Sequence, residues 1–349
     1  MSSKLQASVT VVINTIAQNK KAAGIRVYNL SAGEPKMMTP QVVRDGANKF
    51  IELGDIPYPS PEGLNELRKT AAERMNSLYG STFTQDECII TTGGKFAIYM
   101  LLQYLCGLNS PLKANPTDKI GVIIQAPFWV SYPSITKIMD GKPVIINTSE
   151  AGGWKLTPEM LKAAYTPDCK VLMLNNGVNP TGIIYTRSEM QALMDMAHEL
   201  NLLVISDEVY STLVYTDDEY VSCGSFPEYK NNVVVIQSAS KAFAMTGWRV
   251  GFLFARPDII QVMSALSTQS TTGVCLIAQH GALAAFKHAD EINQWVNETM
   301  KRRRDVFVNA FNKYFGIQLE SPKATLYVFT SLASLGVTGL TDDEFCIRA

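Results

Sequence analysis

Residues 238–251 read SASKAFAMTGWRVG and follow directly on the apolar run VVVIQ at residues 233–237. Such a β-branched run, ending at polar residues, predicts a buried strand. A lysine among small residues at a buried strand end loses hydration, which lowers the pKa of its amine and makes it a nucleophile. Ser238 and Arg249 add the hydroxyl and guanidinium that bind a phosphate monoester. The stretch therefore indicates that Lys241 forms an imine with a phosphorylated aldehyde, although such a lysine taken alone can equally extend to solvent.

Six further apolar runs predict the other strands of the same sheet: residues 88–92, 120–125, 144–147, 171–175, 202–206 and 250–255. Between many of them, apolar residues recur at helical spacing, as in residues 94–107, 187–200 and 257–265. This alternation predicts an α/β fold in which a seven-stranded, mostly parallel sheet is covered by helices on both faces. Ligands of such sheets bind at the carboxyl ends of the strands, so the polar residues there are the candidates for chemistry.

The pattern changes after Asp290, where an amphipathic helix extends to about Tyr314 and short strand candidates follow at residues 316–320 and 325–330. A chain of 349 residues can hold one large domain and a smaller one. We expect three parts: an arm with part of the small domain at residues 1–40, a large cofactor-binding domain at 41–290, and an incomplete small α+β domain at 291–349.

Composition and charge narrow the classes of function. The formal net charge is −1 without a long run of Lys or Arg, which gives no electrostatic reason to expect nucleic acid or a membrane as partner. The six cysteines form no CxxC pair or short metal-binding spacing, so we expect reduced core residues and no metal. No secretory signal precedes the body, and no stretch approaches the ~18 apolar residues of a membrane span. We expect a cytoplasmic protein.

Polar side chains also follow two neighbouring predicted strands. In SDEVY at residues 206–210, the Asp207 carboxylate suits a hydrogen bond to a pyridine nitrogen, and the Tyr210 phenol suits the ring's 3′-oxygen. Asn179, in NPTG at residues 179–182, can reach the same oxygen. Alone, an Asp-Glu pair is more often a helix N-cap and NPTG a loop. Their order before SASK favours a shared site for pyridoxal 5′-phosphate.

Two further strand ends contribute to the predicted site. Residues 91–95 read TTGGK and join a strand to a helix, so the amides of Gly94 and Lys95 can bind a phosphate. The Lys95 side chain either neutralises that phosphate or attracts a second, distal carboxylate of the substrate. Trp129 follows the strand at residues 120–125 and can stack on a pyridine, although most such tryptophans pack in a core.

With these residues assembled, the sequence resembles the fold-type I pyridoxal-phosphate aminotransferases. The likeness is greatest to the bacterial aspartate aminotransferases of the prephenate-related subgroup and extends from Val9 to about Arg348. The motifs that carry it, in order, are SAGEP (31–35), YPSPEG (58–63), GGK (93–95), APFWVSYP (126–133), NPTG (179–182), SDEVY (206–210) and SKAFAMTGWRVG (240–251). The combination is far more specific than any one of them.

The resemblance implies an enzyme that moves an amino group between aspartate or glutamate and a 2-oxo acid through pyridoxal 5′-phosphate, with ping-pong kinetics. It implies that Lys241 forms the Schiff base and moves the proton. The implied cofactor contacts are Asp207, Tyr210, Asn179, Trp129, Ser238, Arg249, Gly94 and Lys95, together with Tyr58 from the other subunit of a homodimer. The implied substrate contacts are Gly33, Asn179, Trp129 and Lys95, aided by a hydroxyl of the N-terminal arm from Ser8 or Thr10.

One departure from the family pattern sets an expectation of its own. The family's arginine for the substrate α-carboxylate lies in an Arg-(Leu/Ile)-Ser segment, some tens of residues beyond Ala349. We expect a shortened chain, which binds the cofactor but orients amino acids poorly without that arginine. The alternatives are an aromatic or broad-specificity aminotransferase that accepts prephenate, a lyase of the same fold, a regulatory module, and a cofactor-binding protein with little activity.

Overall fold

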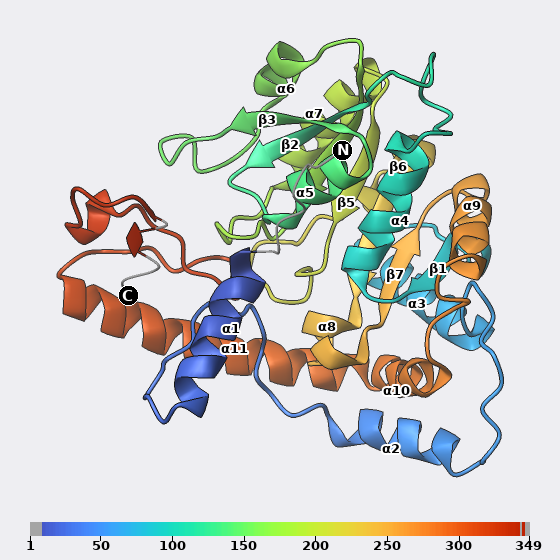
Figure 1. Cartoon of the computed structure of the whole chain (residues 1–349), viewed down its shortest axis with the longest axis horizontal. Helices are drawn as coiled ribbons and strands as arrows, with labels where there is room; N and C mark the ends of the chain where they lie inside the picture. The colour runs from blue at the N-terminus through green and yellow to red at the C-terminus, as the bar shows by residue number, and fades with distance from the viewer. Residues whose placement is uncertain (1–8, 343, 346–349) are drawn as a thin grey trace.

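A seven-stranded sheet forms the centre of the protein in a computed structural model, which describes residues 9–342, 344 and 345 (Figure 1). Its strand order is β1-β7-β6-β5-β4-β2-β3, and β7 runs antiparallel to both neighbours while the other pairs are parallel. The strands are β1 Cys88–Thr91, β2 Gly121–Ala126, β3 Lys142–Asn147, β4 Cys169–Asn175, β5 Leu203–Asp207, β6 Val233–Ser238 and β7 Gly251–Phe254. All seven predicted strands are confirmed, with boundaries within two residues.

The alternation of side chains along each strand divides the core into two layers. In β6, Val233 and Val235 face one layer, whereas Val234 and Ile236 face the other. The second layer is covered by α4 Gly94–Cys106, α5 Ser131–Ile138 and α9 Pro257–Thr268. The first is covered by α3 Asn65–Tyr79, α6 Pro158–Ala164, α7 Arg187–Glu199 and α10 Leu276–Lys287. Because both faces of the inner strands are buried, these strands are largely apolar rather than alternating with polar residues, whereas the edge strand β3 is mostly exposed or half-buried.

The remaining helices lie around this body. They are α1 Val9–Ala22, α2 Gln41–Ile51, the short α8 Ala239–Ala242 and the long α11 Ala289–Phe315. Helix α2 packs along α10, where the missing side chain of Gly46 allows close approach to Ala284. Figure 1 shows α11 passing below the sheet, with the segment that follows it, in red, at its far end. None of the described helices combines the length and the apolar character needed to cross a membrane.

The predicted strands at 316–320 and 325–330 are wrong. The structure shows only an isolated bridge in that region, between Val214 and Ala324. Thr325 has φ +74°, which interrupts the extended conformation that a strand requires. Its segment follows the loop after β5 instead, with Tyr215 N bonded to Lys323 O and Thr325 N bonded to Leu213 O.

Candidate active site

The carboxyl ends of β1, β2, β4, β5 and β6 lie at the same edge of the sheet, because these strands are mutually parallel. Most residues that the sequence singled out follow these ends. The β6 end continues directly into α8, whose N-cap is Ser238, and Ser238 Oγ accepts a hydrogen bond from Ser240 N. This cap turns the chain so that Lys241 occupies the last turn of α8, at the same sheet edge.

Lys241 is half-buried, and its ammonium donates a hydrogen bond to Gly33 O. Burial lowers the pKa of this amine to about 8; Glu34 opposes the shift, and Arg249 adds to it. A substantial fraction of the amine is therefore neutral near neutral pH, which is the state that attacks an aldehyde.

Arg249 lies over the turn that begins α4. Gly93, at φ +82°, has no side chain, and a Cβ built there would lie only 2.9 Å from Arg249 Cζ. Gly251 is needed for a similar reason, since its Cβ would meet Gly93 C and Gly94 N at 2.5 Å. The amides of Gly94 and Lys95 occupy the first positions of α4, where helical N–H groups lack intrahelical partners. The Arg249 guanidinium, the Ser238 hydroxyl and the N–H groups at the start of α4 together make an anion site.

The charges of this site fit a phosphate. Burial and then the nearby Arg249 guanidinium lower the pKa of Lys95, and Arg249 also lowers the pKa of Lys241. Within the described part of the chain, none of the three cations forms an ion pair with a carboxylate. Neighbouring like charges repel, at reduced strength where side chains are exposed as those of Lys95 and Arg249 are, and a bound anion compensates the repulsion. The phosphate of pyridoxal 5′-phosphate, a dianion, supplies such compensation.

The carboxylate expected at the pyridine nitrogen is buried and held by a tyrosine. Asp207 is 6% exposed, and burial raises its pKa, whereas hydrogen bonds from Tyr132 Oη at 2.7 Å and Val209 N at 3.3 Å lower it. Asn175 Nδ2 fixes the backbone by donating to Asp207 O at 2.7 Å. A buried carboxylate of this kind suits a protonated pyridine nitrogen as its partner. Sequence reasoning missed Tyr132, although it stands in the APFWVSYP motif.

The residues expected at the ring's 3′-oxygen also come together. Tyr210 Oη lies 2.7 Å from Tyr327 Oη, and Asn179 Nδ2 donates to Tyr327 Oη at 3.3 Å. Gly33 is packed against the same tyrosine, since a Cβ there would lie 2.8 Å from Tyr327 Cζ. Tyr327 was not predicted, because the sequence placed it in a strand. No local signal connects it with Gly33 or Tyr210.

Trp129 and Lys95 are neighbours in space. The Lys95 ammonium lies 4.8 Å from the centre of the Trp129 ring, within the range of a cation–π interaction. The edge of Tyr132 supports the indole, with ring centroids 5.4 Å apart. The cation and the flat ring face the same region of the site.

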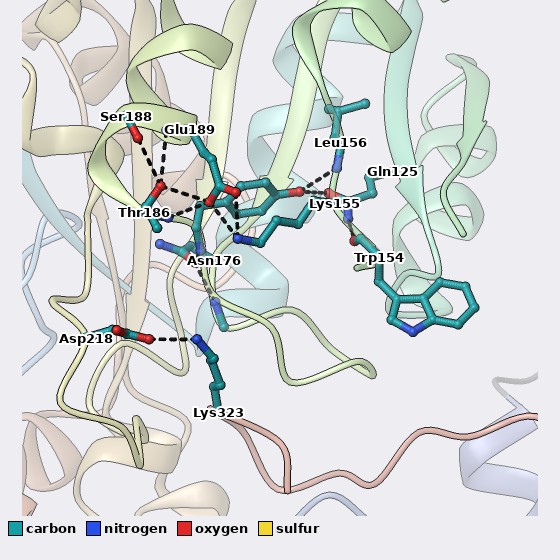
Figure 2. A network of polar contacts seen from close by, with 12 residues as sticks. Gln125, Trp154, Lys155, Leu156, Asn176, Thr186, Ser188, Glu189, Asp218 and Lys323 are labelled. Atoms are coloured by element: carbon teal, nitrogen blue, oxygen red, sulfur yellow. Dashed lines mark hydrogen bonds and ion pairs between the residues drawn. The ribbon is translucent and has the colours of Figure 1, made fainter. Parts of the chain in front are cut away.

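A polar network anchors the end of β2, which leads to Trp129 (Figure 2). Gln125, the penultimate residue of β2, accepts a hydrogen bond from Tyr185 Oη at 2.6 Å and donates to Trp154 O at 2.7 Å. Tyr185 Oη accepts in turn from Leu156 N at 2.9 Å. The strand end is thereby tied to the loop before α6 and to the segment before α7.

Residues 25–348 match the family model of aminotransferase class I and II. The chain belongs to this family. It is 33% identical to the aspartate/prephenate aminotransferase of Cereibacter sphaeroides, over 98% of this chain and 85% of that protein. It is 34% identical to the aspartate aminotransferase of Bacillus subtilis, over 98% of this chain and 86% of that protein.

Solved structures agree with the assignment. The aspartate aminotransferase of Thermotoga maritima superposes with a TM-score of 0.88 at 30% identity, covering 99% of this chain and 87% of that one. The enzyme of Thermus thermophilus with maleate gives 0.85 at 32% identity, covering 92% and 81%. The protein is thus a pyridoxal-phosphate-dependent aminotransferase of fold type I, acting on amino acids and oxo acids. Its predicted family, fold, cofactor and class of reaction are confirmed.

Three predicted residues are not brought into the aminotransferase site by the described chain. Tyr58 is 89% exposed. Ser8 lies outside the described residues, and for Thr10 only the backbone, near the start of α1, is described.

Proposed function

We propose that this aminotransferase moves the amino group of aspartate or glutamate to a 2-oxo acid in two half-reactions of a ping-pong cycle. The observation that carries the proposal is the position of Lys95, whose ammonium lies beside Trp129 without a carboxylate partner among the described residues. A dicarboxylic substrate supplies that partner. The names of the relatives support this choice, as does the maleate, a dicarboxylate, in the Thermus thermophilus structure.

The residues of the site have separable roles in this proposal. When bound, pyridoxal 5′-phosphate supplies an aldehyde for imine formation and a ring that withdraws electrons from the substrate α-carbon. Lys241 holds the cofactor, and its amine, with a pKa near 8, moves the proton of the α-carbon. Asp207 keeps the ring nitrogen protonated, while Tyr210 and Asn179 hold the 3′-oxygen.

The remaining contacts serve the phosphate, the ring and the substrate. Ser238, Arg249 and the amides of Gly94 and Lys95 bind the phosphate, which fits the anion site described above. Trp129 stacks on the ring and contacts the substrate. Gly33 and Asn179 also contact the substrate, and a hydroxyl from Ser8 or Thr10 assists Lys95.

The first test locates the imine. Reduction of the holoenzyme with borohydride, followed by peptide mapping, should place the label on Lys241, and Lys241→Ala should abolish it. A label on another residue, or none in the wild type, refutes the proposed site. Initial-rate kinetics should show the parallel-line pattern of ping-pong exchange, and a sequential pattern contradicts the mechanism.

The second test concerns Lys95. Lys95→Ala should slow the half-reaction with aspartate roughly 10- to 100-fold, since a charge-assisted hydrogen bond contributes about 1.5–3 kcal/mol. The half-reaction with phenylalanine should change little. Lys155→Ala is the matched control, because Lys155 also lies over an aromatic ring, that of Tyr185, but outside the site. Equal losses with both amino acids, together with weaker cofactor binding, would instead assign Lys95 to the phosphate.

We also propose a homodimer with shared active sites. The segment before α3 exposes several large apolar side chains, which favours burial against a second copy. They include Tyr28, Leu30, Met38, Leu53 and Tyr58. Mixing inactive Lys241→Ala subunits with Tyr58→Ala subunits should restore one intact site per hybrid dimer, if Tyr58 serves the partner's phosphate. A mixture no more active than its components contradicts shared sites.

The expected division into domains remains a proposal. Residues 41–290 form the cofactor-binding domain, which contains every strand of the sheet, and residues 1–40 with 291–349 form a smaller one. Limited proteolysis should leave a resistant fragment ending near residue 290, and cuts distributed through the sheet region contradict this division. We also place the enzyme in the cytoplasm, a reducing compartment, which agrees with the free cysteines among the described residues.

A further inference from the structure

Tyr327 reaches the site from a segment far away in the sequence. Its hydroxyl lies 2.7 Å from Tyr210 Oη, and the two rings meet edge to face with centroids 5.9 Å apart. Asn179 Nδ2 approaches the same hydroxyl at 3.3 Å. Tyr327 therefore touches both residues that the proposed function assigns to the cofactor's 3′-oxygen.

The backbone at Gly33 is shaped around this tyrosine. A Cβ at residue 33 would lie 2.8 Å from Tyr327 Cζ and closer still to its hydroxyl, so only glycine admits the contact. The carbonyl of the same Gly33 accepts the hydrogen bond from the Lys241 ammonium. The Tyr327 hydroxyl thus lies where residues of the arm, of the β4 and β5 ends and of the C-terminal segment meet.

Two proton arrangements fit the contact between Tyr327 and Tyr210, because either hydroxyl can be the donor. Burial raises the pKa of Tyr327, so the hydroxyl carries its proton near neutral pH. The Asn179 amide can only donate to this oxygen. When the Tyr327 proton points to Tyr210 Oη, Tyr210 accepts it and keeps its own proton free for another acceptor. In the opposite arrangement Tyr210 donates its proton to Tyr327 Oη, and that proton is then not available to another acceptor.

We infer that Tyr327 is a positioning residue that accepts from Asn179, donates to Tyr210 and thereby directs the Tyr210 proton toward the 3′-oxygen of the cofactor. The inference rests on the proposed function, in which Tyr210 and Asn179 hold that oxygen. A hydrogen bond donated to the 3′-oxygen draws negative charge toward the donor, so the oxygen attracts the proton of the neighbouring imine less strongly. Weakening the donor therefore raises the affinity of the imine for its proton.

The test is a pH titration of the visible absorbance of the bound cofactor in the holoenzyme. Tyr327→Phe keeps the ring and its packing but loses the hydroxyl. The midpoint of the titration should rise by roughly half to one pH unit, the size expected for one hydrogen bond. Tyr215→Phe is the matched control, because buried Tyr215 donates to Thr325 O of the same segment at 2.6 Å without touching the site. Its midpoint should remain that of the wild type.

The outcomes separate this inference from the proposed function. If the midpoint of Tyr327→Phe equals that of the wild type, the inference is overturned. The proposed function still stands in that case, provided that borohydride labels Lys241. Equal shifts in both variants also overturn it, because they indicate a general displacement of the segment. A missing label on wild-type Lys241 overturns the proposed function and the inference together. Thermal unfolding of both variants verifies that they fold.

Discussion

Replacing Gly93 by alanine should weaken cofactor binding by displacing Arg249. Gly93 has φ +82° and ψ 158°, a conformation essentially restricted to glycine. The new Cβ would lie 2.9 Å from Arg249 Cζ and closer still to Arg249 Nη2, so the guanidinium must retreat by about 1 Å to reach ordinary contacts of 3.4 Å. The Arg249 side chain extends over the start of α4, where the phosphate is expected, and the displacement disrupts its contact with the phosphate.

The magnitude follows from the two effects of the substitution. Backbone strain of about 1–3 kcal/mol is present with or without cofactor, so it lowers the stability of the fold rather than the affinity. The lost charge-assisted hydrogen bond, worth about 1.5–3 kcal/mol, is specific to the bound state. The dissociation constant of pyridoxal 5′-phosphate should therefore increase roughly 10- to 100-fold.

The assay is a titration of apoenzyme with pyridoxal 5′-phosphate, followed by absorbance. Gly80→Ala is the matched control, since Gly80 has φ +68° at the end of α3 and a Cβ there meets nothing within 4 Å. It should lose about 1 kcal/mol of stability and keep its affinity for the cofactor. If Gly93→Ala binds within roughly a factor of three of the wild type, a change below 1 kcal/mol, the placement of the phosphate beside Arg249 is refuted.

Three buried titratable groups give further predictions. Tyr132→Phe should slow the first half-reaction at least about tenfold in single-turnover kinetics, because a hydrogen bond to a charged group contributes roughly 1.5–3 kcal/mol to holding Asp207 ionised; an unchanged rate contradicts this. The rate of reconstitution with cofactor should rise with pH and level off near 8, because the neutral amine reacts and burial lowers the pKa of Lys241 to about 8; stopped-flow rates still climbing toward the ordinary lysine pKa of about 10.4 would exclude this. Burial raises the pKa of Glu208 from 4.5 to about 7, so its favourable contribution to folding is complete below pH 4.5 and is lost as the pH rises through 7. Urea unfolding should show the stability of the wild type falling relative to Glu208→Gln over that range, and a constant difference argues against the raised pKa.

The sequence predicted the sheet well because buried parallel strands are locally recognisable. Each strand is a short apolar run, and most of these runs end in polar residues at the candidate site, such as Asp207, the last residue of β5, and Lys241, which follows β6. Because parallel strands run in the same direction, their carboxyl ends lie at one edge of the sheet. The residues that we expect to contact the cofactor could therefore be proposed without knowledge of which strand neighbours which.

Contacts between distant segments were not predictable in this way. Tyr327 enters the site only because Thr325, at φ +74°, turns the chain and because Gly33 leaves room for the ring. Neither condition is visible in the local pattern, which predicted a strand there instead. Tyr132 was overlooked for a related reason, since a tyrosine in α5 resembles ordinary core until Asp207 is found 2.7 Å away.

Arg249, Lys95, Lys241 and Gly93 together create a site that needs a bound anion. Burial and, to a lesser extent, Arg249 lower the pKa values of Lys95 and Lys241, so the guanidinium disfavours both ammonium charges when no anion is bound. The glycine at position 93 brings the guanidinium closer to the helix start than any other residue permits, which increases that cost. A phosphate dianion attracts every one of these groups, and the added attractions offset the repulsion among the cations. The close placement of these cations is unfavourable when no anion is bound. For the same reason it should favour a phosphorylated aldehyde over an unphosphorylated one.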